Sequence, residues 1–280
     1  MVLGTNWEKN MDYPLHRDAD GRWIHTWVRQ SSIKTADMCM ERFRKDIYSL
    51  SAERPKDVNT FGTACHAVAE DALQARMNGK DETLDGLLYA FDYYWDEAKL
   101  LIDDDQWTKY KPETIGAEGY SRITDWYNQI YNADEKIIPT GIEQDFNKIL
   151  WEDNERVIYA RGTIDLVEEN RVWDWKFPSR DYSRNKWEYE RWDVQSIMYC
   201  WATDIPLFRF GIIHPKGVSY IELERDSSHT EWMKQKVLAL AKFVENAPRG
   251  QWPLGDNGWW CSEKWCPNWT SCKGATGGIT

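Results

Sequence analysis

Asp165, Asp174 and Lys176 stand in two neighbouring apolar runs of the sequence, and their spacing could support metal-ion chemistry. Side chains alternate along a β-strand, so Asp174 and Lys176 would project from the same face. If the chain turns over residues 168–171, Asp165 falls about opposite Asp174. Two facing carboxylates repel each other unless a positive charge lies between them, and a divalent cation with oxygen ligands is the natural candidate. Lys176 could then orient a water molecule and stabilise charge that develops on a phosphate.

The same three residues also have a simpler interpretation, an exposed charged strand face with an ion pair. Both runs are rich in apolar residues, as in Ile164-Asp165-Leu166-Val167 and Val172-Trp173-Asp174-Trp175, which predicts central strands. Central strands rarely carry charge without a compensating partner. The pattern therefore favours the cation site.

The elements that would position these residues change character along the chain. Apolar spacing and capping residues predict a mostly helical first half, with helices at 31–48, 61–77, 85–101 and 115–131. Apolar and β-branched runs then predict strands at 142–150, 157–167, 171–177, 208–213 and 218–223. Two further helices are predicted at 190–203 and 229–246. This order predicts an α/β (α+β) fold with a mixed central sheet flanked by helices.

Composition limits the class of protein. The chain has 280 residues, 42% of them hydrophobic and 29% charged, which is typical of a globular protein. The net charge of −11 argues against a surface that binds nucleic acid everywhere, although a narrow basic channel remains compatible with it. No apolar run is long enough to span a membrane and no signal peptide is recognised, so we expect a cytoplasmic protein. Six cysteines in a reducing compartment indicate metal binding rather than disulfides.

The two strand motifs resemble those of the RecB-like nucleases of the PD-(D/E)xK superfamily, which have a restriction-endonuclease-like core. That family reads Gly-x-Ile-Asp on one strand and Asp-x-Lys on the next, as in Gly162-Thr163-Ile164-Asp165 and Asp174-Trp175-Lys176. Three flanking motifs also match: Phe61-Gly62-Thr63-Ala64-Cys65-His66, Gly141-Ile142-Glu143 and Gln195-x-x-x-Tyr199. The resemblance implies that Mg²⁺ or Mn²⁺ is held by His66, Asp165, Asp174 and the Trp175 carbonyl. The catalytic and supporting residues that it implies are Lys176, Asp165, Asp174, Glu143, Gln195 and Tyr199.

Taken one at a time, the flanking residues have ordinary structural interpretations. His66 alone could be a core histidine with satisfied hydrogen bonds, and Glu143 could be a solvated strand residue. Gln195 and Tyr199, one helical turn apart, could form a helix surface pair with a buried ring. Five motifs in the family's order favour the site.

The cysteines fall into two groups. Cys261, Cys266 and Cys272 lie close together near the C-terminus, and Cys39 lies in the first predicted helix. The resemblance extends to iron–sulfur members of the family, the CRISPR-associated adaptation exonucleases and AddB-type subunits, and implies a [4Fe–4S] cluster on these four residues. Four residues separate Cys261 from Cys266 where the family usually has two, so zinc and a thiol cluster without metal remain alternatives. The other two cysteines, at positions 65 and 200, are predicted to be small core residues.

The resemblance implies a Mg²⁺- or Mn²⁺-dependent deoxyribonuclease, an exonuclease that hydrolyses single-stranded DNA or DNA ends. Recombination, repair and phage DNA metabolism use this architecture, and the chain resembles phage-borne exonucleases. The competing hypotheses are a catalytically silent DNA-binding or scaffold subunit of a recombination or repair complex, and a zinc-stabilised interaction module. No phosphate-binding loop motif is found, so unwinding would require a helicase or recombination partner.

We expect a single nuclease domain over residues 1–273, followed by a disordered tail at 274–280. Within it, 31–135 would be mostly helical, 140–247 would form the catalytic sheet core, and 248–273 would close back on Cys39. Basic residues after the Asp-x-Lys strand could contact a DNA backbone or simply form a solvated loop: Arg180, Arg184, Lys186 and Arg191.

Overall fold

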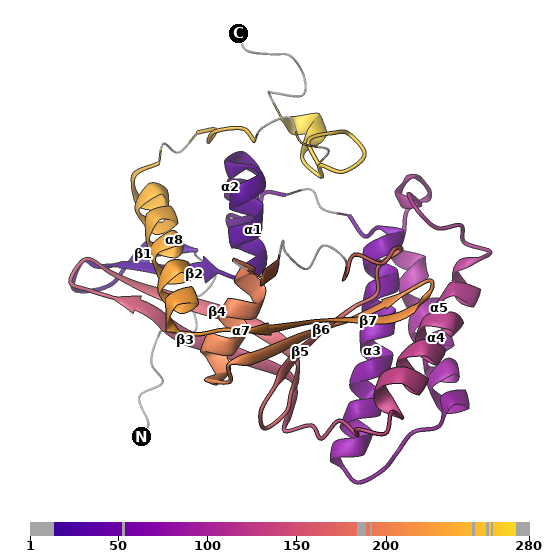
Figure 1. Ribbon diagram of the computed structural model, residues 1–280. Coiled ribbons are helices and arrows are strands. Elements are labelled where there is room, and N and C mark those ends of the chain that lie inside the picture. Colours follow the sequence, from indigo (N-terminus) through magenta and orange to yellow (C-terminus); the bar gives the residue numbers. More distant parts are fainter. Residues whose placement is uncertain are drawn as a thin grey trace, which may run out of the picture. The chain divides into compact units, whose positions relative to one another are not determined.

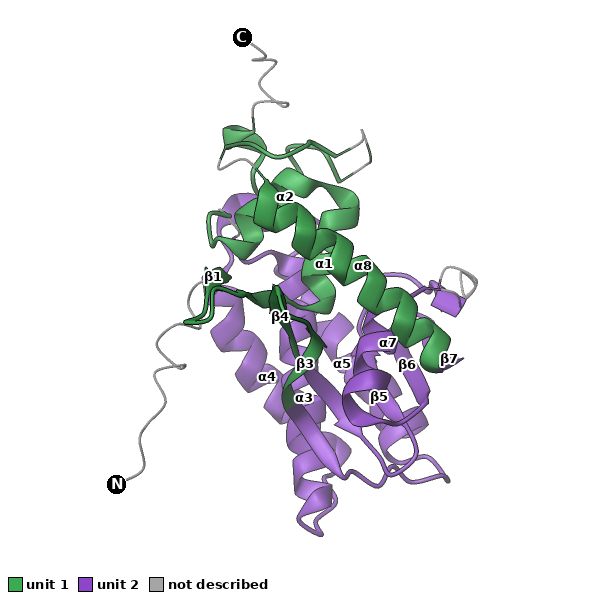
Figure 2. Ribbon diagram, turned by 90° about the vertical axis from the view of Figure 1, so that its left-hand side faces the viewer, with its two compact units in different colours: residues 1–53, 145–162, 227–280 green, residues 54–144, 163–226 purple. Residues whose placement is uncertain are grey.

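The computed structural model describes residues 14–51, 54–183, 189–190, 192–247, 250–255, 258 and 260–272 (Figure 1). Arg184, Lys186, Arg191 and the predicted tail at 274–280 lie outside the described residues. The chain divides into two compact units, coloured in Figure 2. Unit 1 comprises residues 1–53, 145–162 and 227–280, and unit 2 comprises residues 54–144 and 163–226. The single domain over 1–273 stays a prediction.

In the part that the structure describes, unit 1 combines strands with α-helices and a 3-10 helix. Its elements are β1 (Leu15–Arg17), β2 (Trp23–Val28), α1 (Gln30–Met38), α2 (Met40–Ile47), α8 (Ser227–Asn246) and the 3-10 helix Trp269–Ser271. Strands β3 (Gly141–Glu152) and β4 (Arg156–Val167) contribute residues to both units. Strand β1 pairs antiparallel with β2, and β2 pairs parallel with β4. Strands β1 and β2 were not predicted, although the run Trp23-Ile24-His25-Thr26-Trp27-Val28 has the aromatic and β-branched content of a strand.

The helix predicted at 31–48 is wrong in one respect, because the structure has two helices that meet at Cys39. Cys39 has extended backbone angles, φ −165° and ψ 116°. Its sulfur accepts a hydrogen bond from the main-chain N–H of Arg42 at 3.5 Å, so the thiol caps the start of α2. A second N–H, from Gly255, donates to the same sulfur at 3.2 Å. This contact with a segment distant in the sequence stabilises a break that helical periodicity does not reveal.

Unit 2 contains the remaining regular elements. Its helices are α3 (Asp57–Met77), α4 (Leu84–Ala98), α5 (Ile115–Trp126) and α7 (Val194–Thr203), with 3-10 helices Lys99–Leu101 and Asp104–Gln106 and the π-helix Tyr127–Tyr131. Its strands, besides parts of β3 and β4, are β5 (Val172–Lys176), β6 (Leu207–His214) and β7 (Gly217–Glu224). Helices α3, α4 and α5 pack against one another, as Figure 1 shows. Among the described residues no helix has the length and apolar character that crossing a membrane requires.

Two helix starts differ from the sequence prediction, each for an identifiable reason. Helix α3 begins at Asp57, because the buried Asp57 carboxylate accepts hydrogen bonds from Thr108 Oγ1 and from the N–H groups of Lys109 and Tyr110 at 2.6–2.8 Å. Helix α7 begins at Val194 rather than near residue 190, because the Asp193 side chain caps it by accepting from the N–H of Ser196 at 2.8 Å.

The sheet in unit 2 is mixed. Strand β5 pairs antiparallel with β4 and parallel with β6, and β6 and β7 form the predicted antiparallel hairpin. Helix α5 packs against β6 and β7, and α7 packs against β5 and β6. Unit 1 also mixes parallel and antiparallel pairing. The predicted fold class, a mixed sheet flanked by helices, is confirmed.

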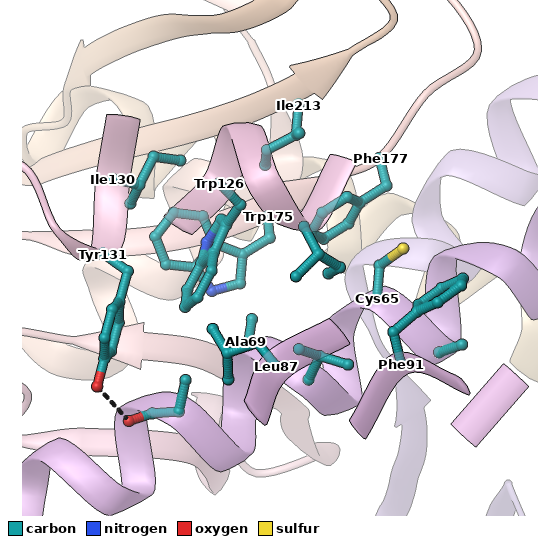
Figure 3. Packing of buried hydrophobic residues seen from close by; sticks show 14 of the residues in the cluster. Cys65, Ala69, Leu87, Phe91, Trp126, Ile130, Tyr131, Trp175, Phe177 and Ile213 are labelled. Atoms are coloured by element: carbon teal, nitrogen blue, oxygen red, sulfur yellow. Dashed lines mark hydrogen bonds between the residues drawn. The ribbon is translucent and has the colours of Figure 1, made fainter. Parts of the chain in front are cut away.

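The core of unit 2 lies between the sheet and α3, α4 and α5 (Figure 3). The Trp126 ring meets the Trp175 ring edge to face, with centroids 6.1 Å apart. Trp175 lies over Gly211, its neighbour on β6, where an added Cβ would come within 2.6 Å of the indole. This packing fixes the face of β5 that carries Trp175 and leaves Asp174 and Lys176 on the opposite face.

Candidate metal centre

Strands β4 and β5 position the two aspartates as the sequence predicts. The antiparallel register pairs Leu166 with Trp173, so the next position along the strands sets Asp165 beside Asp174. The Asp165 carboxylate accepts a hydrogen bond from the Trp175 N–H at 2.7 Å. This bond ties the side chain of one motif to the main chain of the other.

Helix α3 brings His66 to the same place. Its Nδ1 lies 3.4 Å from Asp165 Oδ2, and its ring contacts that of Phe177 with centroids 5.5 Å apart. Burial lowers the pKa of His66, and the nearby Lys176 adds to this effect while Asp174 opposes it. The imidazole is therefore held in the neutral form that can donate a lone pair to a cation.

Glu143 completes a three-residue group. One potential ligand atom from each of His66, Glu143 and Asp165 lies within 4.8 Å of the other two. The Glu143 backbone is in the left-handed region, with φ of 43°, inside strand β3. Such a conformation is costly for a residue with a side chain, and it concentrates at functional sites.

The Asp174 carboxylate has different neighbours. Lys176 Nζ lies 2.5 Å from Asp174 Oδ2, and Gln195 Nε2 on α7 donates to Asp174 Oδ1. Asp174 is buried, whereas a third of the Lys176 side chain is exposed. The predicted Gln195 is thus a direct partner of the second motif, and it fixes the orientation of the Asp174 carboxylate.

The electrostatics of the site reflect its concentrated negative charge. Burial raises the pKa of Asp165 well above its ordinary range, and the neighbouring Asp174 and Glu143 raise it further. Burial also acts to lower the pKa of Lys176, but Asp174 and Asp165 outweigh it, so the net pKa is raised. The raised pKa keeps Lys176 charged beside the two aspartates.

A cavity of about 580 Å³ opens over these residues. Helix α3 lines it with Asn59, Gly62, Thr63, His66 and Glu70, among others. Its further lining residues include Glu143, Asp165, Lys176, Phe177, Pro178 and Tyr182. The site can therefore admit a ligand much larger than a water molecule.

Two aromatic residues that line this cavity, Phe177 and Tyr182, were not predicted from the sequence. Tyr182 stacks on Tyr189, with ring centroids 5.9 Å apart, and burial raises its pKa. Phe177 directly follows the Asp-x-Lys motif, and Tyr182 follows shortly after. Proximity to that motif was the available signal, but neither residue type suggests a role by itself.

The remaining sequence-predicted residues have definite places. Tyr199 is buried on α7 one turn after Gln195; burial raises its pKa, and Asp174 and Asp165 act in the same direction. Cys65 and Cys200 are buried, in agreement with their predicted core positions, and burial raises the pKa of Cys200 to about 12. Arg180 is exposed.

The four other cysteines lie in unit 1. Burial raises the pKa of Cys261, and the thiols of Cys266, Cys272 and Cys39 raise it further. Among the described residues, however, no three of these sulfur atoms lie within 4.8 Å of one another. The segment that carries Cys272 contacts α2, since Lys45 Nζ donates to Ser271 Oγ at 2.6 Å.

Comparison with known proteins identifies the class. The chain belongs to the PD-(D/E)XK nuclease superfamily, which it matches over residues 28–273. No curated protein matches the chain. A solved structure described as "Crystal structure of SSO0001" is 14% identical to this chain, and the match covers 74% of this chain and 94% of that one, with a TM-score of 0.36. Membership of the superfamily supports a nuclease that cleaves phosphodiesters.

Proposed function

We propose that this protein is a Mg²⁺- or Mn²⁺-dependent DNA nuclease, an exonuclease acting on single-stranded DNA or DNA ends. The observation that carries the proposal is the gathering of His66, Glu143 and Asp165 within 4.8 Å at the base of a cavity, beside a charged Lys176. The preference for ends and single strands rests on the sequence resemblance to exonucleases of this superfamily.

The residues fit a hard divalent cation. Two carboxylates and a neutral imidazole offer the oxygen and nitrogen ligands that Mn²⁺ and Mg²⁺ accept. Burial and the neighbouring carboxylates Asp174 and Glu143 raise the pKa of Asp165, and a bound cation would lower it. We propose His66, Glu143 and Asp165 as side-chain ligands, with Asp174 and the Trp175 carbonyl completing the set.

A bound cation would polarise the phosphate and lower the pKa of a water molecule. Lys176 would orient that water and stabilise negative charge on the phosphate, because its ammonium is charged and partly exposed to the cavity. Gln195 would act through Asp174, whose carboxylate it holds in one orientation. Tyr199, buried on the same helix, would support that arrangement. Duplex unwinding would come from a helicase or recombination partner.

The proposal is tested by incubating the protein, prepared without oxygen, with end-labelled single- and double-stranded DNA in Mg²⁺ or Mn²⁺. Lys176→Ala should reduce cleavage by about 10³-fold, because it removes the charge that stabilises the transition state. Lys80→Ala, which removes an exposed lysine after α3, is the matched control and should cleave normally. The product ladder gives the polarity and separates exonuclease from endonuclease action.

The catalytically silent scaffold is the competing function. It is favoured if neither the parent protein nor Lys176→Ala cuts any DNA while both bind it equally. Against it, the structure keeps the charged Lys176, the buried Asp174 and the left-handed Glu143 in one site. A protein that only binds DNA needs none of these costly features.

For unit 1 we propose a [4Fe–4S] cluster on Cys39, Cys261, Cys266 and Cys272. Two main-chain N–H groups already donate to the Cys39 sulfur, as is common for cluster thiolates. One tetrahedral zinc, with Zn–S bonds of about 2.3 Å, needs its sulfurs roughly 4 Å apart. In a [4Fe–4S] cluster the four thiolates bind different iron atoms. Visible absorption and the iron and zinc contents of the anaerobically purified protein decide between the two metals.

A further inference from the structure

Gly62 lies inside helix α3, one turn before His66, and lines the cavity over the candidate metal centre. A Cβ added at Gly62 would meet no atom of the protein within 4 Å. Packing therefore does not require a glycine at this position. Its backbone is helical, so the conformational freedom of glycine is not needed either.

A glycine within a helix has a cost, because glycine destabilises helix interiors relative to alanine. Other helical glycines of unit 2 have local explanations. A Cβ at Gly119 would come within 1.9 Å of the Phe91 ring. Gly86 and Gly116 lie in the first turns of α4 and α5, where glycine costs less. Gly62 lacks any such explanation within the protein.

The space beside Gly62 belongs to the cavity over the candidate metal centre. Thr63 and Ala67, its small neighbours on α3, also line the cavity, and the Thr63 hydroxyl donates back to the Asn59 carbonyl at 3.1 Å. Lys176 and Tyr182 line the cavity as well. The space beside Gly62 is therefore continuous with the space beside the lysine proposed to act on a phosphate.

We propose that Gly62 is a contact point for the substrate, where the sugar–phosphate backbone of the DNA strand lies against α3 next to the scissile phosphate. The inference rests on the proposed nuclease function. A strand backbone is extended and bulky, and a glycine lets it approach the main chain of a helix closely. A side chain at position 62 would hold the strand away from Lys176, while its Cβ would contact no atom of the protein within 4 Å.

The test compares Gly62→Ala and Gly62→Leu with the parent, using single-stranded DNA and the p-nitrophenyl ester of thymidine 5′-phosphate as substrates. For DNA we expect KM to rise about fivefold with alanine and beyond about fiftyfold with leucine, because the strand is displaced from its reactive position. The small ester does not extend along α3, so its hydrolysis should change less than about twofold. Gly62→Ala should also raise the melting temperature by roughly 1–3 °C.

Gly116→Ala is the matched control, because a Cβ there also meets nothing within 4 Å but the residue does not line the cavity. It should leave the KM for DNA unchanged. The inference is overturned if Gly62→Leu keeps the parent's KM for DNA, or if hydrolysis of both substrates falls equally, which would indicate damage to the metal centre. If the parent cuts no DNA, the proposed function fails and binding of single-stranded DNA in Ca²⁺ tests Gly62 alone. Weaker binding by the leucine variant then supports the contact, and equal binding overturns it.

Discussion

The candidate metal centre of unit 2 and the cysteine region of unit 1 differ in how far their ligand atoms are gathered. Atoms of His66, Glu143 and Asp165 lie within 4.8 Å of one another, whereas no three of the cysteine sulfurs do among the described residues. The first group lies on the paired strands β3 and β4 and on helix α3, which packs into the core of unit 2. Three of the cysteines stand in the largely irregular segment after α8.

The two regions therefore differ in what stabilises their conformation. The carboxylate site stands on paired strands and a packed helix; burial and like charges raise the pKa of Asp165 there, and Glu143 has a left-handed backbone. In the cysteine region the neighbouring thiols raise the pKa of Cys261, and a cluster that binds these residues as thiolates would contribute directly to the stability of the fold. Removal of each cation should therefore have different consequences.

The largest expected effect is on stability, from Cys39→Ser. Serine caps a helix as well as cysteine does, so α2 should keep its start and the change should report on loss of a cluster ligand. We expect the melting temperature to fall by about 8 °C, roughly 3 kcal/mol, together with loss of visible absorption. EDTA at a concentration that removes Mg²⁺ should abolish cleavage and leave the melting temperature nearly unchanged. Equal stability of Cys39→Ser and the parent would remove the contrast between the two regions.

Asp57→Asn tests how far the hydrogen bonds at the start of α3 stabilise the helix that carries His66. Burial acts to raise the pKa of Asp57, but hydrogen bonds from Tyr110, Lys109 and Thr108 outweigh it and lower the pKa. A lowered folded-state pKa contributes stability above the unfolded value of about 3.9, and this is lost as pH falls through the folded value. The variant should lose about 2 kcal/mol of unfolding free energy at pH 7 and progressively less below pH 4.

Urea unfolding at pH 7, 5 and 3 checks this prediction. Asp71→Asn, at an exposed carboxylate on the same helix, is the control and should change stability little. A loss from Asp57→Asn that is equal at every pH would show that shape rather than charge fixes the start of α3.

Gln195→Leu should affect catalysis more than stability. Leucine has a similar size but cannot donate to Asp174, so the carboxylate loses its fixed orientation. We expect kcat to fall about tenfold, the usual cost of removing a group that orients a ligand. Gln235→Leu, on α8, should leave kcat unchanged. An unaltered kcat for Gln195→Leu would show that strand pairing alone orients Asp174.

The smallest expected effect is a gain in stability from Glu143→Asn, measured in EDTA. Asparagine tolerates the left-handed backbone better than glutamate and removes one negative charge from the site. We expect the free energy of unfolding to rise by about 0.5–1 kcal/mol while metal-dependent cleavage falls. A loss of stability would show that the Glu143 carboxylate has a structural role that outweighs its strain.

Local patterns in the sequence were enough to predict the strands that carry the two motifs. Alternation along β5 sets Asp174 and Lys176 on one face, and the turn at 168–171 sets the register that brings Asp165 beside Asp174. The helical spacing of Gln195 and Tyr199 depends only on α7. These features are local because strand alternation and helical repeat are properties of neighbouring residues.

Other features depend on contacts between residues far apart in the chain. The break at Cys39 depends on the N–H of Gly255, and the start of α3 depends on main-chain donors at 109 and 110. The strands β1 and β2 are short, and β2 is completed by pairing with β4. Periodicity and capping preference do not predict these features, because the features depend on contacts between segments that are distant in the sequence.

Residue types and spacing alone thus predicted the groups that can act: two carboxylates and a lysine on adjacent strands, a histidine on a helix, and a separate set of thiols. The tertiary structure adds that ligand atoms of Glu143, His66 and Asp165 gather, that Gln195 donates to Asp174, and that Gly62 borders an open cavity. The physical reason is that residue types and spacing along one element specify which side chains can act. The packing of several elements specifies which of them meet.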